Sequence, residues 1–388
     1  MATKLRFLVL AAAMLIGLAC AAVPGRFILT PAATAAPQGP TIYLPLISAD
    51  VHEPPQANYY VSPQGDDDEN DGRSPATAFR TLERALEVIQ PGQTVLILPG
   101  TYHEFVEVYD LGAADAPIVI RGDTSAGGGP VFDGQGRLGS AFQCWWCTNI
   151  IISDLVIRNY RWEGVGIFLS RDITLRNLRI RHTGFGIHAD MEEGGSGITV
   201  VESQNVFVEG NVLEDTGMRI VEEELSGYGI DVWGCQDCVI RGNVVRKVIG
   251  TGILVEESCN VIVDSNTVEE GEMQMLDWWD GGIWLDGGHD VTVRDNTFRN
   301  NHGPGIQVSD TEAVYPQGSL GFVLEDNVSQ GNVFGLYVWN FGICPPPEQA
   351  LRMSGNVLRD NQQDFLCAEW ECGVGQPCVP PSDEPPPC

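Results

Sequence analysis

One phrase of alternating apolar and polar residues recurs along the second half of the chain. Each copy begins with a Gly-Ile step, carries apolar residues at every second position, passes a polar corner and reaches an asparagine. Four successive copies have the same internal length: Gly197 to Asn211, Gly229 to Asn243, Gly252 to Asn266 and Gly282 to Asn296. Alternation with a period of two predicts strands. A repeated phrase with variable gaps is typical of solenoids, in which each turn buries its apolar face against its neighbours.

The shortest turn excludes a solenoid with helices. From Asn243 to Asn266 the chain completes one turn without an insertion, and no helix fits within so few residues. We therefore expect an all-β fold, a right-handed parallel β-helix of about ten coils. The sequence predicts this β-helix over residues 58–366, followed by a Cys- and Pro-rich tail over 367–388.

Asparagines occupy the same place in six coils, where they are expected to stack. A buried amide at a turn can bond to the coils above and below it and satisfy their backbone groups. Leu155 and Leu178 take this place in two earlier coils. The predicted ladder contains Asn211, Asn243, Asn266, Asn296, Asn327 and Asn356.

The N-terminal segment predicts export. Lys4 and Arg6 precede an apolar run that is followed by small residues, so we interpret 1–36 as a signal peptide and 37–57 as a linker. The run is too short for a membrane span, and lipid anchoring through Cys20 is the less favoured alternative to secretion. Before the coils, an amphipathic helix over 78–89 is expected to cap the open end, with Thr77 as its N-cap.

The cysteines of an exported protein are expected to form disulfides. Two C-x-x-C motifs, at 144–147 and 235–238, together look like a zinc site. However, they lie about three coils, or roughly 14 Å, apart, whereas zinc ligands must all lie within about 2.3 Å of the ion. We therefore expect no zinc and no organic cofactor. Cys259, one coil beyond Cys235 and Cys238, favours a disulfide between coils.

The charge balance restricts the partners. The chain has 52 acidic and 22 basic residues and a formal net charge of −30. Such a surface repels nucleic acid and anionic lipid, and it disfavours polyanionic glycans unless calcium bridges them. The acidity is also compatible with a role in solubility alone. We expect a monomer.

The first coils carry a more specific resemblance. The segment YYVSPQG, followed by FRTLERAL and PGQTVLILPGTYHE, resembles the opening of secreted right-handed parallel β-helix proteins of the pectate-lyase-like superfamily. The resemblance covers residues 58 to about 366 and implies the fold. It implies a polysaccharide-active protein without naming the reaction, because that superfamily holds lyases, hydrolases, epimerases and non-catalytic surface proteins. The hydrolase and epimerase motifs of the superfamily are not found, so no catalytic residue is carried over.

The candidate site follows from the alternation of the Gly-Ile strands. The residues two and four positions after each glycine should point outward and form two rows. The first row is Phe168, Thr199, Asp231, Leu254, Trp284, Gln307 and Tyr337, and the second is Ser170, Val201, Trp233, Glu256, Asp286, Ser309 and Trp339. Aromatic rings among acids suit sugars, which offer apolar faces and hydroxyl groups. We expect Trp233, Trp284, Tyr337 and Trp339 to bind substrate.

Three insertions precede Gly-Ile strands and are expected to form the walls of a groove over this face. They carry His188 and Trp279 as further substrate-binding candidates, and Glu222 to Glu224 as acidic ones. Tolerated surface insertions are the alternative. The exposed Trp278-Trp279 pair argues against it, because apolar surface of that size is normally used or covered.

The chemistry of the acids is left open. Asp231, Glu256 and Asp286 should lie in neighbouring coils, where they can supply the acid and base of a glycosidase. They can equally hold calcium or be plain surface acids. Elimination by a lyase, with Lys247 as a weak candidate base, is the second reaction, and a non-catalytic glycan-binding or cell-surface protein is the rival class. A separate weak calcium site is predicted at Asp67, Glu69 and Asp71, or a polar turn in its place.

Overall fold

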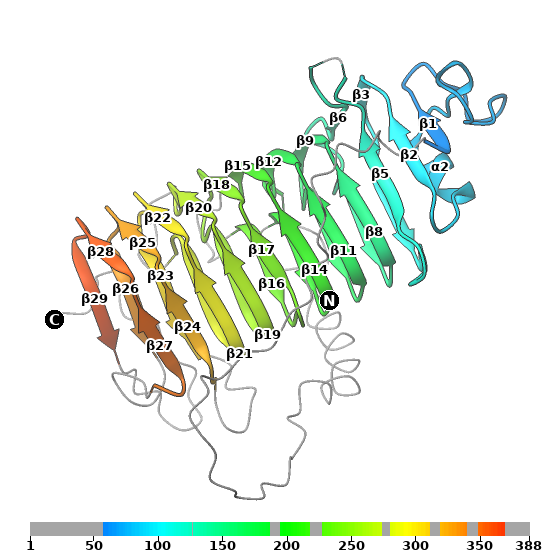
Figure 1. The fold of residues 1–388 in the computed structure, drawn as a ribbon. Coiled ribbons are helices and arrows are strands. Elements are labelled where there is room, and N and C mark those ends of the chain that lie inside the picture. Colours follow the sequence, from blue (N-terminus) through cyan, green and yellow to red (C-terminus); the bar gives the residue numbers. More distant parts are fainter. Residues whose placement is uncertain are drawn as a thin grey trace, which may run out of the picture.

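The computed structural model describes residues 57–125, 127–186, 195–217, 227–273, 280–310, 319–339 and 348–368. These residues form a parallel β-helix whose coils stack along one axis, from the cap at one end to β29 at the other (Figure 1). The predicted signal peptide and linker, apart from residue 57, and the tail after residue 368 lie outside the described residues.

Each coil passes through three faces in turn. The Gly-Ile face contains β4 (Val106–Tyr109), β7 (Phe142–Trp145), β10 (Val165–Phe168), β13 (Ser196–Val201), β16 (Tyr228–Trp233), the first halves of β19 (Ile253–Asp264) and β21 (Ile283–Arg294), β23 (Pro304–Ser309), β26 (Phe334–Trp339) and β29 (Gln363–Ala368).

The second face contains β1 (Tyr59–Val61), β2 (Thr94–Ile97), β5 (Ile118–Gly122), β8 (Thr148–Ser153), β11 (Arg171–Arg176), β14 (Gln204–Glu209), β17 (Val239–Arg241), the second halves of β19 and β21, β24 (Phe322–Glu325) and β27 (Leu351–Ser354). Because β19 and β21 continue through the corner between the two faces, these faces form one sheet of 19 strands.

The third face is a separate sheet of ten strands in the described part of the chain, which agrees with the expected number of coils. It contains β3 (Thr101–Tyr102), β6 (Val131–Asp133), β9 (Val156–Tyr160), β12 (Arg179–Thr183), β15 (Val212–Thr216), β18 (Val244–Arg246), β20 (Thr267–Glu269), β22 (Thr297–Arg299), β25 (Val328–Gln330) and β28 (Val357–Arg359).

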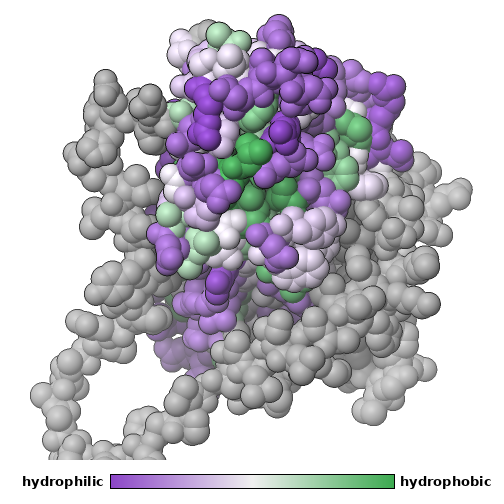
Figure 2. Space-filling view, turned by 90° about the vertical axis from the view of Figure 1, so that its right-hand side faces the viewer, coloured by the Kyte–Doolittle hydropathy of each residue, from purple (hydrophilic) through white to green (hydrophobic). Residues whose placement is uncertain are grey.

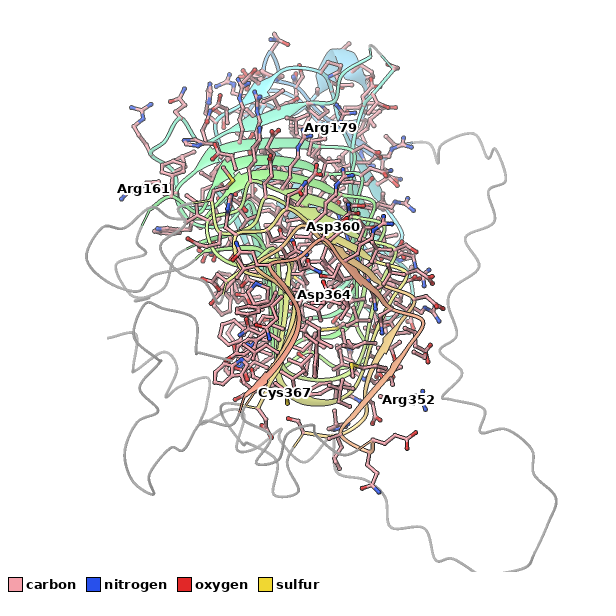
Figure 3. All side chains as sticks on the ribbon, turned by 90° about the vertical axis from the view of Figure 1, so that its left-hand side faces the viewer. Arg161, Arg179, Arg352, Asp360, Asp364 and Cys367 are labelled. Carbon is pink, nitrogen blue, oxygen red and sulfur yellow. A yellow bond between two sulfur atoms is a disulfide. The ribbon has the colours of Figure 1, made fainter. Side chains whose placement is uncertain are left out.

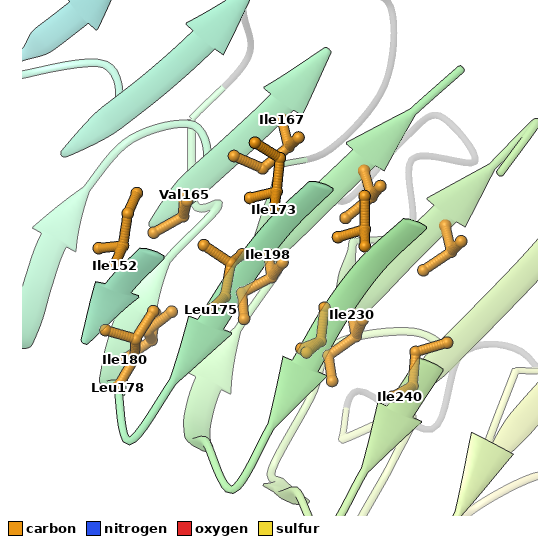
Figure 4. Packing of buried hydrophobic residues seen from close by; sticks show 14 of the residues in the cluster. Ile152, Val165, Ile167, Ile173, Leu175, Leu178, Ile180, Ile198, Ile230 and Ile240 are labelled. Atoms are coloured by element: carbon orange, nitrogen blue, oxygen red, sulfur yellow. The ribbon is translucent and has the colours of Figure 1, made fainter. Parts of the chain in front are cut away.

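The interior is packed by branched aliphatic side chains that stack from coil to coil (Figure 4). Ile198 lies in register with Ile230, and both are fully buried. The same packing explains the glycine of the repeat. A Cβ on Gly229 would come within 2.4 Å of the Gly252 carbonyl oxygen and of Val245 Cγ1, so only glycine fits between the neighbouring coil and the third face.

The asparagine ladder is confirmed. Asn266 Oδ1 accepts hydrogen bonds from Asn243 N and Nδ2, both at 2.9 Å, while its own Nδ2 donates to Ile240 O at 2.8 Å and to Asn296 Oδ1 at 3.0 Å. The same bonds connect all six predicted asparagines. A second ladder, which the sequence reading missed, joins Asn301, Asn332 and Asn361 at the corner after the third face.

The capping helix is shorter than predicted. Helix α2 spans Leu82–Val88, and its N-cap is Thr81, whose side chain accepts a hydrogen bond from Arg84 N. Thr77 instead ends a short 3₁₀-helix, η1 (Pro75–Thr77). Phe79 is extended rather than helical, because its backbone is hydrogen-bonded to Tyr60 and Ser62 of the β1 segment.

The apolar side chains of the cap are buried as expected, Phe79, Leu82, Leu86 and Ile89 being at most 7% exposed. Figure 2, which looks onto this end, shows a mainly hydrophilic surface around a small apolar centre. The amphipathic segment therefore closes the first coil, although only part of it is helical.

The cysteine pairing differs from one expectation. Each C-x-x-C motif forms a disulfide within itself, Cys144–Cys147 and Cys235–Cys238, with Cα–Cα distances of 5.8 and 6.2 Å. A bond from Cys259 to Cys235 or Cys238 is therefore wrong, because both partners are already used. Cys259 and Cys367 also take part in disulfides. Within the described ranges, the helices are too short or too polar to cross a membrane.

Candidate functional site

The two outward rows of the Gly-Ile face exist, with one correction. From Thr199 and Val201 onward the register pairs the residues as predicted, through Asp231 with Leu254 and Trp233 with Glu256. Phe168, however, pairs with Val201 and belongs to the second row. The cause is the doubled glycine of GVGIF: a Cβ on Gly164 would meet the Gly197 carbonyl oxygen at 2.7 Å, so Gly164 takes the place assigned to Gly166. Ser170 lies at the corner instead, where its hydroxyl accepts from Cys147 N.

The three candidate carboxylates lie in three successive coils of this face. Glu256 is in register with Asp286, one strand spacing away, which is about 4.8 Å. Asp231 lies one coil earlier, opposite Leu254 and diagonal to Glu256. Asp231 and Glu256 are half-buried, whereas Asp286 is only 5% exposed.

Asp286 has an ordered hydrogen-bond relay on the next coil. Trp284 Nε1 donates to Ser309 Oγ at 2.8 Å, and the Ser309 hydroxyl donates to Asp286 Oδ1 at 2.7 Å. Since the indole N–H can only donate, it directs the serine hydrogen towards the carboxylate. This relay fixes the orientation of the Asp286 carboxylate.

The four candidate rings differ in exposure. Trp233 and Trp284 are half-buried, and Trp233 Nε1 donates to Glu257 Oε2 at 3.2 Å. Tyr337 and Trp339 are 1% and 8% exposed and stack with centroids 6.2 Å apart. The side chains of Tyr337 and Trp339 point out of the β-helix but are buried. Trp233 and Trp284 are therefore the more accessible rings of the four.

The sequence reading missed a second aromatic group on the same face. Trp145 stacks on Phe168 with ring centroids 4.2 Å apart, and Tyr109 stacks on Trp145 at 6.4 Å. These rings continue the second row towards the cap. Tyr109 and the adjacent Trp146 are 54% and 49% exposed. The Trp-Trp pair inside the first C-x-x-C motif was the signal that could have revealed them.

A pair of glutamates at the edge of the face was also missed. Glu202 and Glu257 occupy the corner after their Gly-Ile strands, with Gly234 at the same corner of the coil between them. A Cβ on Gly234 would lie 3.3 Å from Glu202 Cγ, so the glycine leaves space beside that side chain. Burial raises the pKa of Glu202, and the nearby charge of Glu257 raises it further.

The predicted groove walls are mostly outside the described residues. These include His188, Glu222 to Glu224, Trp278 and Trp279. Two acids at the ends of the third insertion are described and bond to a neighbouring coil. Glu272 accepts from Gly250 N at 3.0 Å, and Asp280 accepts from Thr251 Oγ1 at 2.7 Å. Both are at most 3% exposed, so they contribute to coil packing rather than to a wall.

The acidic turn near the cap makes backbone contacts. Asp67 accepts from Arg80 N at 2.7 Å and from Thr81 N at 3.1 Å, and Asp71 accepts from Arg73 N at 3.0 Å. Glu69 donates its own N–H to Asp66. Among the described residues, no group of three or more His, Cys, Asp or Glu side chains is placed to hold a metal ion. Calcium at this turn stays a prediction.

Lys247 lies at the end of the third face and not on the Gly-Ile face. It follows β18 of the third face, and its Nζ pairs with Glu214 Oε1 at 3.2 Å. Lys247 does precede the Gly252 strand along the chain, as predicted. Its side chain, however, forms its ion pair on the third face.

Comparison with known proteins agrees with this architecture. A family model described as "Right handed beta helix region" matches residues 196–374. The uncharacterized protein YwoF of Bacillus subtilis (strain 168) is 28% identical over 274 residues, which cover 62% of this chain and 56% of YwoF. The chain thus spans little more than half of that relative.

Two solved structures share the fold. The GH136 lacto-N-biosidase from Eubacterium ramulus superposes with a TM-score of 0.52 at 16% identity, over 80% of this chain and 67% of that one. Pectate lyase Pel9A superposes with a TM-score of 0.50 at 16% identity, over 82% of this chain and 80% of that one. The shared fold is the right-handed parallel β-helix.

On this right-handed parallel β-helix, one face combines aromatic rings with carboxylates. Half-buried indoles offer flat apolar surfaces, and carboxylates one coil apart can accept hydrogen bonds from hydroxyl groups or transfer protons. Because the strands are hydrogen-bonded to their neighbours throughout, the side chains are held at fixed spacings.

Proposed function

We propose that this protein binds a polysaccharide along the Gly-Ile face and hydrolyses it with carboxylate side chains outside the cell. The observation that carries this is the register of the face, in which Asp231, Glu256 and Asp286 occupy successive coils next to Trp233 and Trp284. The names of the two solved structures, a lacto-N-biosidase and a pectate lyase, support a glycan as ligand. Export is supported by the signal-like N-terminus and the disulfides.

Within this proposal, Asp286 and Glu256 have different catalytic roles. Asp286, held by the Ser309 hydroxyl, suits the ionised partner, because a donated hydrogen bond stabilises the charge. Glu256, half-buried beside that charge, suits the proton donor, because a neighbouring negative charge favours the protonated form. Two carboxyl groups about 5.5 Å apart belong to retaining hydrolysis, and a wider pair to inverting hydrolysis.

The first experiment is a polysaccharide panel with purified protein. Reducing ends and the ultraviolet absorbance of unsaturated products are both recorded. We expect reducing ends without unsaturated products on at least one substrate. Unsaturated products would instead favour elimination. Binding without either product would favour the non-catalytic class.

The second experiment assigns the carboxylates on the substrate that the panel finds. Glu256→Gln and Asp286→Asn should lower turnover by a factor of about 10² or more while the dissociation constant changes little, because proton transfer acts in the transition state. Glu209→Gln, on the second face, is the matched control and should leave turnover unchanged. If a chelator removes turnover in the parent protein as fully as these variants do, calcium rather than proton transfer is the role of the cluster.

A further inference from the structure

The charges of the β-helix are divided unequally among its three faces. In the described Gly-Ile strands, the outward positions hold acidic, aromatic, aliphatic and uncharged polar residues, and none holds Lys, Arg or His. The acids are Glu107 in β4, Asp231 in β16, Glu256 in β19 and Asp286 in β21. This face therefore presents negative charge from near the cap to beyond its middle.

Most arginines of the described coils lie on the other two faces, where acids neutralise several of them. On the second face Arg241 Nε pairs with Asp264 Oδ2 at 2.9 Å, and on the third face Arg299 pairs with Glu269 at 2.7 Å. In the view along the axis, Arg179 and Arg352 lie on sides of the coil away from Cys367, which is in the last Gly-Ile strand (Figure 3). Apart from Arg161, in the corner before β10, the described coils thus hold most of their positive charge away from the Gly-Ile face.

The edge of the face adds to its negative charge. Glu202 and Glu257 stand at the adjoining corner, and the charge of Glu257 contributes to raising the pKa of Glu202, so these groups already repel one another. Within the three insertions, residues 187–194, 218–226 and 274–279 together hold seven acids by sequence, and Arg219 is the only lysine or arginine in these ranges. The cations on this side are few: Arg161 lies in the corner before β10, and Arg219 lies in the second insertion by sequence. Acids therefore outnumber the cations that could pair with an anionic ligand.

We infer that the ligand of the Gly-Ile face is a glycan that carries no carboxylate or sulfate groups. This inference rests on the proposed function and names its substrate class. A polyuronate would place one negative charge per sugar against this row, at a cost of about 1 kcal/mol for each close pair even in water. Neutral sugars meet no such cost. They can stack on Trp233 and Trp284 and donate hydroxyl hydrogens to the carboxylates.

The test measures binding of the full-length exported protein to soluble glycans of three kinds at low ionic strength. Neutral probes are mixed-linkage β-glucan, xyloglucan and galactomannan. Acidic probes are polygalacturonate and alginate, and chitosan oligosaccharides are the amino-sugar probe. Each is measured in chelator and again with added calcium. We expect binding to at least one neutral or amino-sugar probe, and no measurable binding to the acidic probes in chelator.

A charge variant tests the cause of the discrimination. Glu256→Gln should increase the affinity for polygalacturonate about fivefold at low salt, because it removes one close repulsion. The gain should shrink in high salt, where such repulsion is screened. Glu209→Gln, which removes the same charge from the second face, should change nothing.

The outcomes separate the two claims. Binding to polygalacturonate or alginate in chelator, at least as tight as to any neutral or amino-sugar probe, overturns the inference and leaves the proposed function standing. Binding to acidic probes only when calcium is added also overturns it and identifies calcium as the bridge. No binding to any probe contradicts the proposed function itself.

Discussion

At the scale of single residues, Glu104 has an unusual environment. Its side chain lies under the cap, where Oε2 accepts from Leu82 N at 2.9 Å. Burial raises its pKa from 4.5 to about 7, although backbone hydrogen bonds from Leu82 and Glu83 lower it and the charges of Asp67 and Glu83 raise it further. The folded protein therefore holds a proton that the unfolded chain releases above pH 4.5.

This predicts a loss of stability as the pH rises. The contribution of Glu104 is fully present below about pH 4.5 and disappears as the pH rises through about 7, because the folded state binds more protons in that window. The loss is at most about 3 kcal/mol in the free energy of unfolding. Denaturant unfolding of Glu104→Gln across this range should lack that decline, whereas Glu107→Gln, exposed on β4, should retain it. An unchanged pH profile in Glu104→Gln would sink the prediction.

The rings of the Gly-Ile face make a second prediction at this scale. Trp233→Ala should weaken glycan binding by about 1–3 kcal/mol, the value of burying a large apolar side chain. Trp233→Phe should keep most of the affinity, because a ring remains. Calorimetric titration with the bound glycan measures both. Met353→Ala, which removes an exposed apolar side chain from the second face, is the control. Equal losses in Trp233→Ala and Met353→Ala would remove Trp233 from the binding face.

At the scale of elements, the asparagine ladder replaces ordinary turn chemistry. Asn266 is 1% exposed, and its side chain makes four hydrogen bonds to the coils on either side. Removing its amide leaves two buried backbone groups of the preceding coil, Asn243 N and Ile240 O, without this partner, which is costly inside a protein. These hydrogen bonds hold neighbouring coils at a fixed spacing at this corner.

We therefore expect Asn266→Ala to lower the free energy of unfolding by about 3 kcal/mol. Asn356→Ala should cost only about 1 kcal/mol, because this residue is half-buried at the last step of the ladder, where water can replace the lost bonds. Urea unfolding of both variants gives the comparison. A smaller loss in Asn266→Ala than in Asn356→Ala would contradict the structural role of the ladder.

At the scale of the whole molecule, the two ends of the β-helix differ. The first coil is covered by α2, whose Leu82 and Ala85 are at most 1% exposed. The last coil leaves Val357 and Phe365 44% and 41% exposed. In a solenoid each coil is stabilised by its neighbours, so a terminal coil with exposed apolar side chains is the weakest.

Hydrogen exchange should reveal this asymmetry. We expect amides of β27, β28 and β29 to exchange at least about tenfold faster than those of β16, β19 and β21, with the strands beside the cap intermediate or slow. Mass spectrometry of peptic fragments is sufficient to resolve the three groups. Uniform protection along the axis would mean that the molecule opens only as one unit.

The sequence by itself determined the coil and its register. A period of two, with glycine and asparagine at constant spacing, allowed only a parallel β-helix, because a shift of one residue would turn the apolar side chains outward. It also placed Asp231, Glu256 and Asp286 in successive coils. These features follow from the repeat itself, which can be seen directly in the amino-acid sequence.

Only the tertiary structure decided which side chains are accessible and what they contact. Tyr337 and Trp339 are covered, Trp145 stacks on Phe168 in the same row, and Ser309 joins Trp284 to Asp286 across one coil. The cysteines paired within their motifs, although the spacing favoured neighbouring coils. Burial, side-chain direction and pairing depend on groups that are distant in the chain, so a periodic pattern does not contain them.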